Sequence, residues 1–167
     1  MQICTRTSLF ALLPLILLVC GGCGSSRSSV IQQPVPGYHA DSLRLVAEGA
    51  DGLVITEDQR RTLVKAFEDR VYDARAFQRG QSGLTASYHV TAGNPGSRGL
   101  RFWIGLWTGE GTITVEVEWR TAAGVVCART QHTGVVSGGA FGGSWNKAFE
   151  KCGNEIGEFA ITTFLER

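Results

Sequence analysis

The stretch Thr112–Arg120 (TITVEVEWR) decides the fold, because its side chains alternate between two chemical classes. Ile113, Val115, Val117 and Trp119 are apolar, and the residues between them are threonine or glutamate. A period of two places the apolar side chains on one face of a β-strand and the polar side chains on the other. The stretch is therefore expected to be a strand with one buried face.

Three neighbouring segments are expected to join this strand in one sheet. The turn 121–124 (TAAG) is short, so residues 125–132 should return as an antiparallel partner. Residues 84–92 (LTASYHVTA) alternate with the same period, and residues 42–48 (SLRLVAE) do so in part.

Two amphipathic helices are expected beside the strands. Thr56 and Gln59 have the spacing of a capping box, in which each side chain satisfies a free backbone N–H, so a helix should begin there and end at 74–79. A second helix should run over 144–164, with Ser144 as its N-cap. The spacing of three or four predicts its buried face: Trp145, Phe149, Cys152, Ile156, Phe159 and Ala160.

The order of these elements is β-α-β-β-β-α. Each element has a single apolar side to bury, so an economical fold places both helices on the same side of the strands. The sequence therefore predicts an α+β fold, with a small mixed sheet and two helices packed on one face.

The N-terminal residues are typical of a bacterial lipoprotein signal. Arg6 precedes an apolar run at 9–20 (LFALLPLILLVC), which is too short for a stable membrane-spanning helix. Cys23 follows two glycines and is expected to receive the lipid after residues 1–22 are removed. A secreted protein without lipid is the alternative, and a CxxC redox pair with Cys20 is disfavoured because no thioredoxin-like βαβ pattern surrounds it.

Residues 23–40 are rich in Ser, Gln, Pro and Gly and are expected to form a flexible tether, leaving 41–167 as one domain. Removal of the signal takes Arg6 from the 16 basic side chains and leaves 15, against 15 acidic ones. This balance argues against a nucleic-acid binder. The expected partners are the membrane, through the lipid, and another envelope protein, with the domain at the outer membrane facing the periplasm.

Two cysteines, Cys127 and Cys152, remain once the signal has been removed and Cys23 carries lipid. An oxidising compartment favours a disulfide between them. The alternative is a pair of buried thiols that behave as small apolar side chains.

No pattern of catalytic, cofactor-binding or metal-binding residues is evident. The glycine-rich stretch 138–144 lacks the lysine of a phosphate-binding loop. His39, His89 and His132 do not have metal-ligand spacing, and no G-x-S-x-G motif is present. The expectation is a protein that is not an enzyme and holds no cofactor. A hydrolase or thiol enzyme, with Cys127 beside His89 or His132, is the alternative.

Residues 100–111 (LRFWIGLWTGEG) concentrate large aromatic side chains between glycines. Phe102, Trp103 and Trp107 are candidate partner-binding residues, because exposed aromatic side chains anchor partners or membrane interfaces. The alternative is a lid that folds back over the core, since large aromatic side chains are usually buried.

Residues 96–143 place an arginine and a hydrophobic pair before a glycine-rich turn, two strands joined by a glycine turn, and paired glycines before the last helix. In this pattern the chain resembles the bacterial lipoproteins grouped as domain of unknown function 4410. The matching positions are Arg101, Gly105, Gly109, Val115, Val117, Gly124, Gly138, Gly142 and Gly143. Trp107 departs from the pattern, which has a small residue there. The resemblance implies an envelope lipoprotein with no assigned reaction.

The order of elements is also similar to that of small domains in curli-secretion-type and cell-wall-synthase-activating lipoproteins, which are adaptors or assembly parts. The expected function is a non-catalytic binding or adaptor domain of the cell envelope. The alternatives are the enzyme based on Cys127 and a subunit of an oligomeric secretion assembly.

Overall fold

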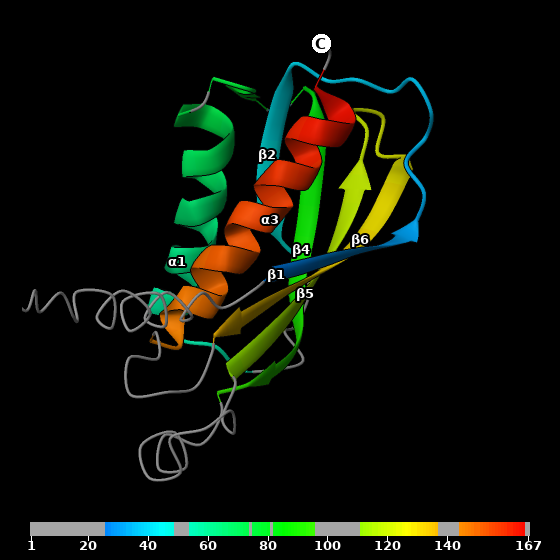
Figure 1. Cartoon of the computed structure of the whole chain (residues 1–167). Helices are drawn as coiled ribbons and strands as arrows, with labels where there is room; N and C mark the ends of the chain where they lie inside the picture. The colour runs from blue at the N-terminus through cyan, green and yellow to red at the C-terminus, as the bar shows by residue number, and fades with distance from the viewer. Residues whose placement is uncertain are drawn as a thin grey trace, which may run out of the picture.

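The computed structural model of the chain describes residues 26–48, 54–73, 75–80, 82–95, 111–136 and 144–165. The predicted α+β class is confirmed: a six-stranded mixed sheet carries two helices packed against it (Figure 1). The elements in chain order are β1 (Ser26–Gln32), β2 (Ser42–Ala47), α1 (Glu57–Glu68), the π-helical turn η1 (Asp69–Asp73), β3 (Gln78–Arg79), β4 (Leu84–Asn94), β5 (Gly111–Arg120), β6 (Val126–Val136) and α3 (Asn146–Phe164).

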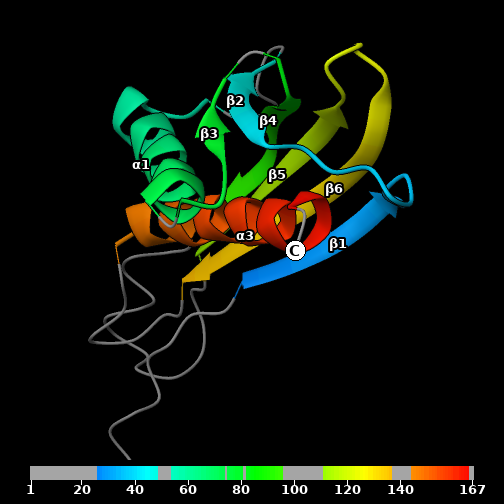
Figure 2. The same ribbon diagram turned by 90° about the horizontal axis from the view of Figure 1, so that it is seen from above.

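The strand order across the sheet is β1-β6-β5-β4-β2-β3. The central strand β5 is antiparallel to both of its neighbours, β4 and β6, whereas β2 runs parallel to β4. The alternation along β5 predicted a strand with one buried face, and its four apolar side chains are all buried beneath the helices. Both helices lie on one side of the sheet when it is seen from above (Figure 2).

The predicted capping box begins α1, with hydrogen bonds from Gln59 N to Thr56 Oγ1 at 3.3 Å and from Thr56 N to Gln59 Oε1 at 2.8 Å.

The two helices contact each other closely. A Cβ at Gly153 in α3 would lie 2.3 Å from the backbone oxygen of Leu63 in α1. Glycine at this position therefore permits the close approach that buries Leu63 and Phe67 against the sheet.

The first residues that the structure describes correct the prediction of a flexible tether at 23–40. Ser26–Gln32 form β1, which pairs antiparallel with β6. The segment has no apolar period, but its backbone pairs with β6, and its serines bond to polar partners on β6 and α3. The folded domain therefore includes residues from Ser26 onward, not only those after residue 40.

The predicted N-cap of the last helix is also wrong. Trp145, not Ser144, occupies the N-cap position of α3, and no side-chain hydrogen bond caps the helix there. The indole of Trp145 contacts the start of β5 instead, since a Cβ at Gly111 would lie 2.9 Å from it. The start of α3 therefore coincides with a packed aromatic ring and not with a capping side chain.

Candidate functional site

A chain of hydrogen bonds, which we call the β1 network, joins β1 to β6 and α3. It consists of Ser26, Ser28, Thr130, His132 and Glu155. Ser28 Oγ lies 2.9 Å from His132 Nδ1 and 3.0 Å from Glu155 Oε2. Ser26 Oγ donates to Glu155 Oε1 at 2.5 Å. The network therefore attaches the first strand to the last helix.

The network continues inward from His132 to the core. His132 Nε2 lies 2.8 Å from Thr130 Oγ1, which accepts a hydrogen bond from Trp119 Nε1 at 2.9 Å. The Ser28 hydroxyl has one proton, which it donates to Glu155, so Ser28 must accept from His132 Nδ1. When the imidazole is neutral, its Nε2 accepts from the Thr130 hydroxyl.

The protonation state of His132 follows from its surroundings. Its side chain is fully buried. Burial lowers the pKa of His132 from 6.5 to about 4, against the opposing charge of Glu155, which raises it. The imidazole is therefore neutral at pH 7, and the hydrogen bonds accommodate this form.

The β1 network is built to hold a strand rather than to activate a nucleophile. Ser28 donates its proton to Glu155, and His132 donates to Ser28 instead of accepting from it. A serine nucleophile needs the imidazole as its proton acceptor. The geometry therefore assigns these residues a positioning role for β1.

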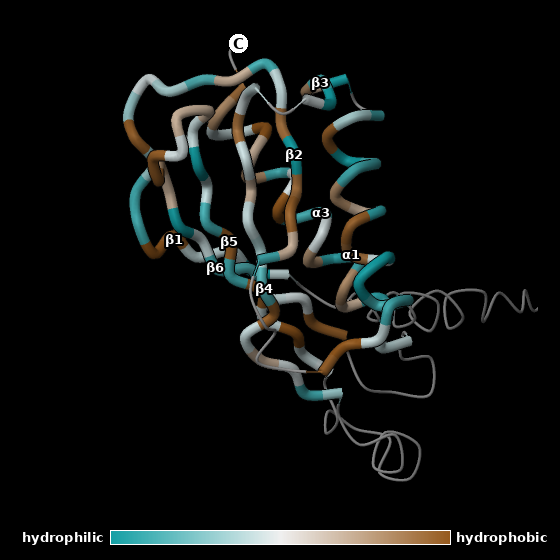
Figure 3. Tube along the Cα trace, turned by 180° about the vertical axis from the view of Figure 1, so that it is seen from behind, coloured by the Kyte–Doolittle hydropathy of each residue, from teal (hydrophilic) through white to brown (hydrophobic). Residues whose placement is uncertain are grey.

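The side of the sheet opposite the helices, which we call the open face, carries a ladder of charged side chains. Figure 3 views the molecule from behind and shows hydrophilic residues along these strands. Glu118, on β5, pairs with Arg120 on its own strand and with Arg129 on β6, the latter at 2.6 Å. One row further along, Glu116 accepts from Gln131 at 3.3 Å and lies 3.7 Å from His89 Nε2. Such cross-strand pairs stabilise a sheet that has only one buried face.

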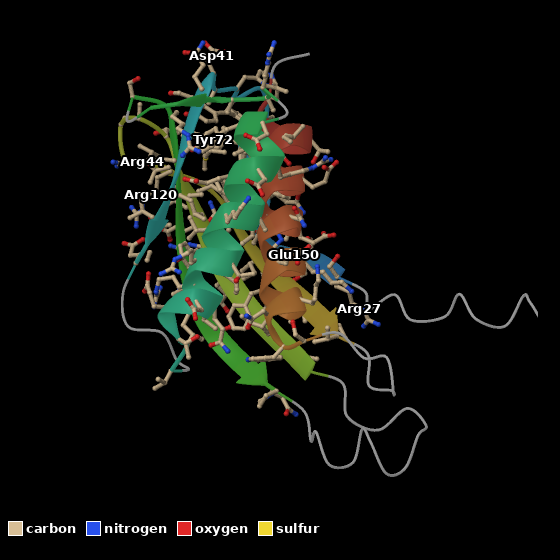
Figure 4. All side chains as sticks on the ribbon, turned by 90° about the vertical axis from the view of Figure 1, so that its left-hand side faces the viewer. Arg27, Asp41, Arg44, Tyr72, Arg120 and Glu150 are labelled. Carbon is tan, nitrogen blue, oxygen red and sulfur yellow. The ribbon has the colours of Figure 1, made fainter. Side chains whose placement is uncertain are left out.

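Polar contacts on the open face continue onto β2. Arg44 on β2 donates from Nε to Thr85 Oγ1 at 3.0 Å. Figure 4 shows Arg44 and Arg120 projecting from the sheet on the side away from the helices. A shallow groove of about 230 Å³ crosses this face, and the two carboxylates that line it, Glu116 and Glu118, already have partners.

The two predicted disulfide partners, Cys127 and Cys152, are free buried thiols in the structure. Cys127 Sγ lies 3.3 Å from Trp119 O, and Cys152 Sγ lies 3.3 Å from His132 O. Cys127 and His132 are five residues apart on one strand, which at ~3.3 Å per residue is roughly 16 Å. A disulfide requires Cβ atoms about 4 Å apart, so the fold opposes the predicted bond.

Neither thiol has the environment of a catalytic cysteine. Burial raises the pKa of the Cys127 thiol, and it raises that of Cys152 further. The thiolate is the reactive form, so a raised pKa makes a cysteine less nucleophilic. His89 lies on the open face beside Glu116, on the other side of the sheet from the buried His132.

The remaining predicted residues, Cys23, Phe102, Trp103 and Trp107, lie outside the described residues. The three histidines are separate, and the described part of the chain contains no cluster of three or more His, Cys, Asp or Glu that could hold a metal. Across the same residues, no helix has the length and apolar character needed to cross a membrane.

Sequence reasoning missed the β1 network. One signal for it was available, because His132 has the same strand parity as Thr130 and faces Val115 in the antiparallel register. That parity places the imidazole among the buried side chains. Ser28 and Glu155 gave no local signal, because Ser28 is separated by 104 residues from His132 and by 127 residues from Glu155.

Comparisons with known proteins give a fold but no family. No protein-family model matches the chain, and no curated protein is significantly similar to it. The PelC dodecamer from Paraburkholderia phytofirmans, in space group P6, is similar with a TM-score of 0.53 and 11% identity, over 86% of this chain and 100% of the PelC chain. A dodecamer of a singly substituted PelC from the same organism, in space group C2, is similar with a TM-score of 0.53 and 14% identity over the same shares. The chain therefore has a fold similar to that of PelC.

Proposed function

We propose that this chain is a non-catalytic subunit of an oligomeric assembly of the bacterial cell envelope, held at the outer membrane by a lipid on Cys23. The observation that carries the proposal is the similarity in fold to PelC dodecamers over 86% of the chain. The signal pattern at 1–22 supports the same compartment.

The position of β1 supports anchoring close to the membrane. β1 begins at Ser26, three residues after Cys23. Three residues span at most about 10 Å, so a lipid on Cys23 would hold the folded domain against the bilayer. The β1 network strengthens this attachment, because it fixes the strand nearest the lipid to α3.

The aromatic segment would contact the envelope partner from the same end of the sheet. Residues 96–110 connect the end of β4 to the start of β5 at Gly111. Gly111 pairs with Val136, and Ser26 pairs with Gly134, two residues away on β6. The described residues on either side of this segment, Asn94 and Gly111, therefore lie at the end of the sheet where β1 begins.

The alternative function, an enzyme based on Cys127, finds no support in the geometry. The Cys127 side chain is fully buried, its pKa is raised, and its sulfur bonds to a backbone oxygen. We therefore favour the assembly subunit over a thiol enzyme.

The test is purification of the full lipoprotein from membranes in a mild detergent, followed by intact and native mass spectrometry. A diacylglycerol-modified chain that begins at Cys23 and a native mass of several copies are expected. Cys23→Ala should abolish the lipid mass and membrane retention, whereas Cys20→Ala, a matched change within the signal, should leave both unchanged. A strictly monomeric protein would contradict the assembly proposal.

A further inference from the structure

The outer edge of β1 is open. β1 lies at one end of the strand order and pairs with β6 alone, and no other strand of the described residues lies along it. Six of its seven residues are exposed, including Val30 at 41% and Ile31 at 57%. An edge strand presents unpaired N–H and C=O groups to any passing strand, and proteins usually protect such edges with charge, proline or a bulge.

The protection of β1 is limited to its two ends. Arg27 is its only charged residue, and the irregularity in its pairing lies between Val30 and Gln32. The segment from Arg27 to Val30 pairs regularly with β6 and carries no proline. This stretch is therefore a template for a further strand.

The opposite side of the sheet ends in a second open edge. β3 pairs only with Ser42 and Leu43 of β2, so from Arg44 to Ala47 the outer edge of β2 has no strand beside it among the described residues. Arg44 and Ala47 are exposed, and Val46 is 37% exposed. The two edges are similar in length.

The strand directions make the two edges complementary. β1 is antiparallel to β6, β6 to β5 and β5 to β4, while β2 is parallel to β4. β1 and β2 therefore run in opposite directions. If a second copy lies beside the first in the same orientation, its β1 meets β2 of the first as an antiparallel partner, the arrangement that most sheets use.

The charges at the two edges are also complementary. One row of paired residues crosses the sheet from edge to edge. Ser29 lies opposite Gln131, and Gln131 lies opposite Glu116. Glu116 lies opposite His89, and the row then reaches Glu48 beyond the end of β2. Arg27 lies two residues from Ser29, so Arg27 of one copy would come diagonally opposite Glu48 of the next. Neither Arg27 nor Glu48 has an ion-pair partner among the described residues, and both are exposed.

We propose that neighbouring copies of this chain join edge to edge, with β1 of one copy pairing antiparallel with residues 44–48 of the next. This inference rests on the proposed function, because it names the contact that would build the oligomer. The contact joins two different edges, so each copy keeps one free edge and a further copy adds in the same way. Repeated addition gives a ring where the rotation between copies closes.

The β1 network prepares the edge for this contact. Ser28 and Ser26 attach the side of β1 that faces α3 to Glu155, and His132 attaches it to the core. A strand that is already ordered loses less conformational freedom when a partner strand adds to it. The polar network therefore presents a rigid template at the position where the neighbouring copy binds.

The test is cysteine crosslinking in the full lipoprotein in its membrane. Ser29→Cys is combined in turn with Arg44→Cys, Val46→Cys or Glu48→Cys. These three positions are two residues apart, so the pairs test three registers between the strands of neighbouring copies. A short bismaleimide is added, and covalent species are separated under reducing conditions. The unsubstituted chain and Ser29→Cys with Thr162→Cys, an exposed site on α3 away from both edges, are the controls.

The expected result is that at least one β1–β2 pair shifts most of the chain into a ladder that extends beyond the dimer, while each single variant and both controls remain monomeric. Dimers from Ser29→Cys alone would overturn the inference, because they would show a two-fold contact between β1 strands. A multimeric native mass without crosslinks from any pair would also overturn it and leave the proposed function standing. A monomeric native mass would overturn both.

Discussion

Acidification should weaken the fold through His132, because this imidazole is neutral and buried in the folded protein. Burial lowers the pKa of His132 from 6.5 to about 4, partly opposed by Glu155. Between these values the unfolded chain binds a proton that the folded chain excludes. The free energy of unfolding is therefore unaffected well above pH ~6.5, falls as the pH drops below that value and levels off below about pH 4.

The size of the effect follows from the shift in the pKa of His132. One pKa unit corresponds to about 1.4 kcal/mol, so the full shift corresponds to about 3 kcal/mol, of which about 2 kcal/mol is lost between pH 7 and pH 5. A small domain has a total free energy of unfolding of about 5–15 kcal/mol, so a loss of this size is readily measured.

The assay is guanidinium chloride unfolding of the mature protein at pH 7 and pH 5, followed by tryptophan fluorescence. His132→Gln keeps a side chain that can hydrogen bond but cannot titrate, so its pH dependence accounts for every other group in the protein. The wild type should lose about 2 kcal/mol more than this variant between the two pH values. Equal losses in the two proteins would refute the reasoning.

A second variant keeps the test decisive if His132→Gln folds poorly. Glu155 raises the pKa of His132, so Glu155→Gln should lower that pKa further and leave the pH dependence as steep as in the wild type or steeper. A shallower pH dependence in Glu155→Gln would show that His132 is not the group responsible.

Three further predictions concern packing, the thiols and the first helix. Gly153→Ala should lower the free energy of unfolding by about 1–3 kcal/mol, because its Cβ would overlap the backbone of α1, whereas Asn154→Ala on the exposed side of α3 should change it by less than about 0.5 kcal/mol. Equal melting temperatures for the two variants would contradict the close helix contact. Maleimide labelling without reductant should leave Cys127 and Cys152 unmodified in the native protein and label both after unfolding, since both are free and buried; labelling of both only after reduction would show the disulfide. Thr56→Ala should cost about 1 kcal/mol in chemical unfolding through loss of the capping box, and Thr56→Ser should restore most of it.

The sequence predicted the elements whose signal is local. The period of two along β5 identified the central strand and its buried face, because alternate side chains of a strand point to opposite sides. The spacing of Thr56 and Gln59 identified the start of α1 for a similar reason, since a capping box lies within four residues. Both patterns arise from backbone geometry and need no distant partner.

The features that the sequence did not predict depend on residues far apart in the chain. β1 has no apolar period, and it is held by β6 and by Glu155. Glu155 is separated by 127 residues from Ser28 and by 129 residues from Ser26. The pairing of Cys127 with Cys152 was predicted from compartment and number alone. The pairing of β5 with β6 is irregular between Trp119 and Arg120, and the adjacent residues Cys127 and Ala128 are both buried. Alternation along β6 also does not show which of its residues lies beside Cys152 of α3.

The attachment of β1 to β6 and α3 also sets the order in which the domain can fold. β1 is synthesised before every other described element, yet its backbone partners lie at 129–134 and its side-chain partner is Glu155. Contacts of such high sequence separation form slowly, because a long loop must close before they are made. β1 therefore has no partner until almost the whole chain has been synthesised. If residues 1–22 are the export signal that we propose, late closure of this sheet edge leaves β1 unpaired while the chain is exported.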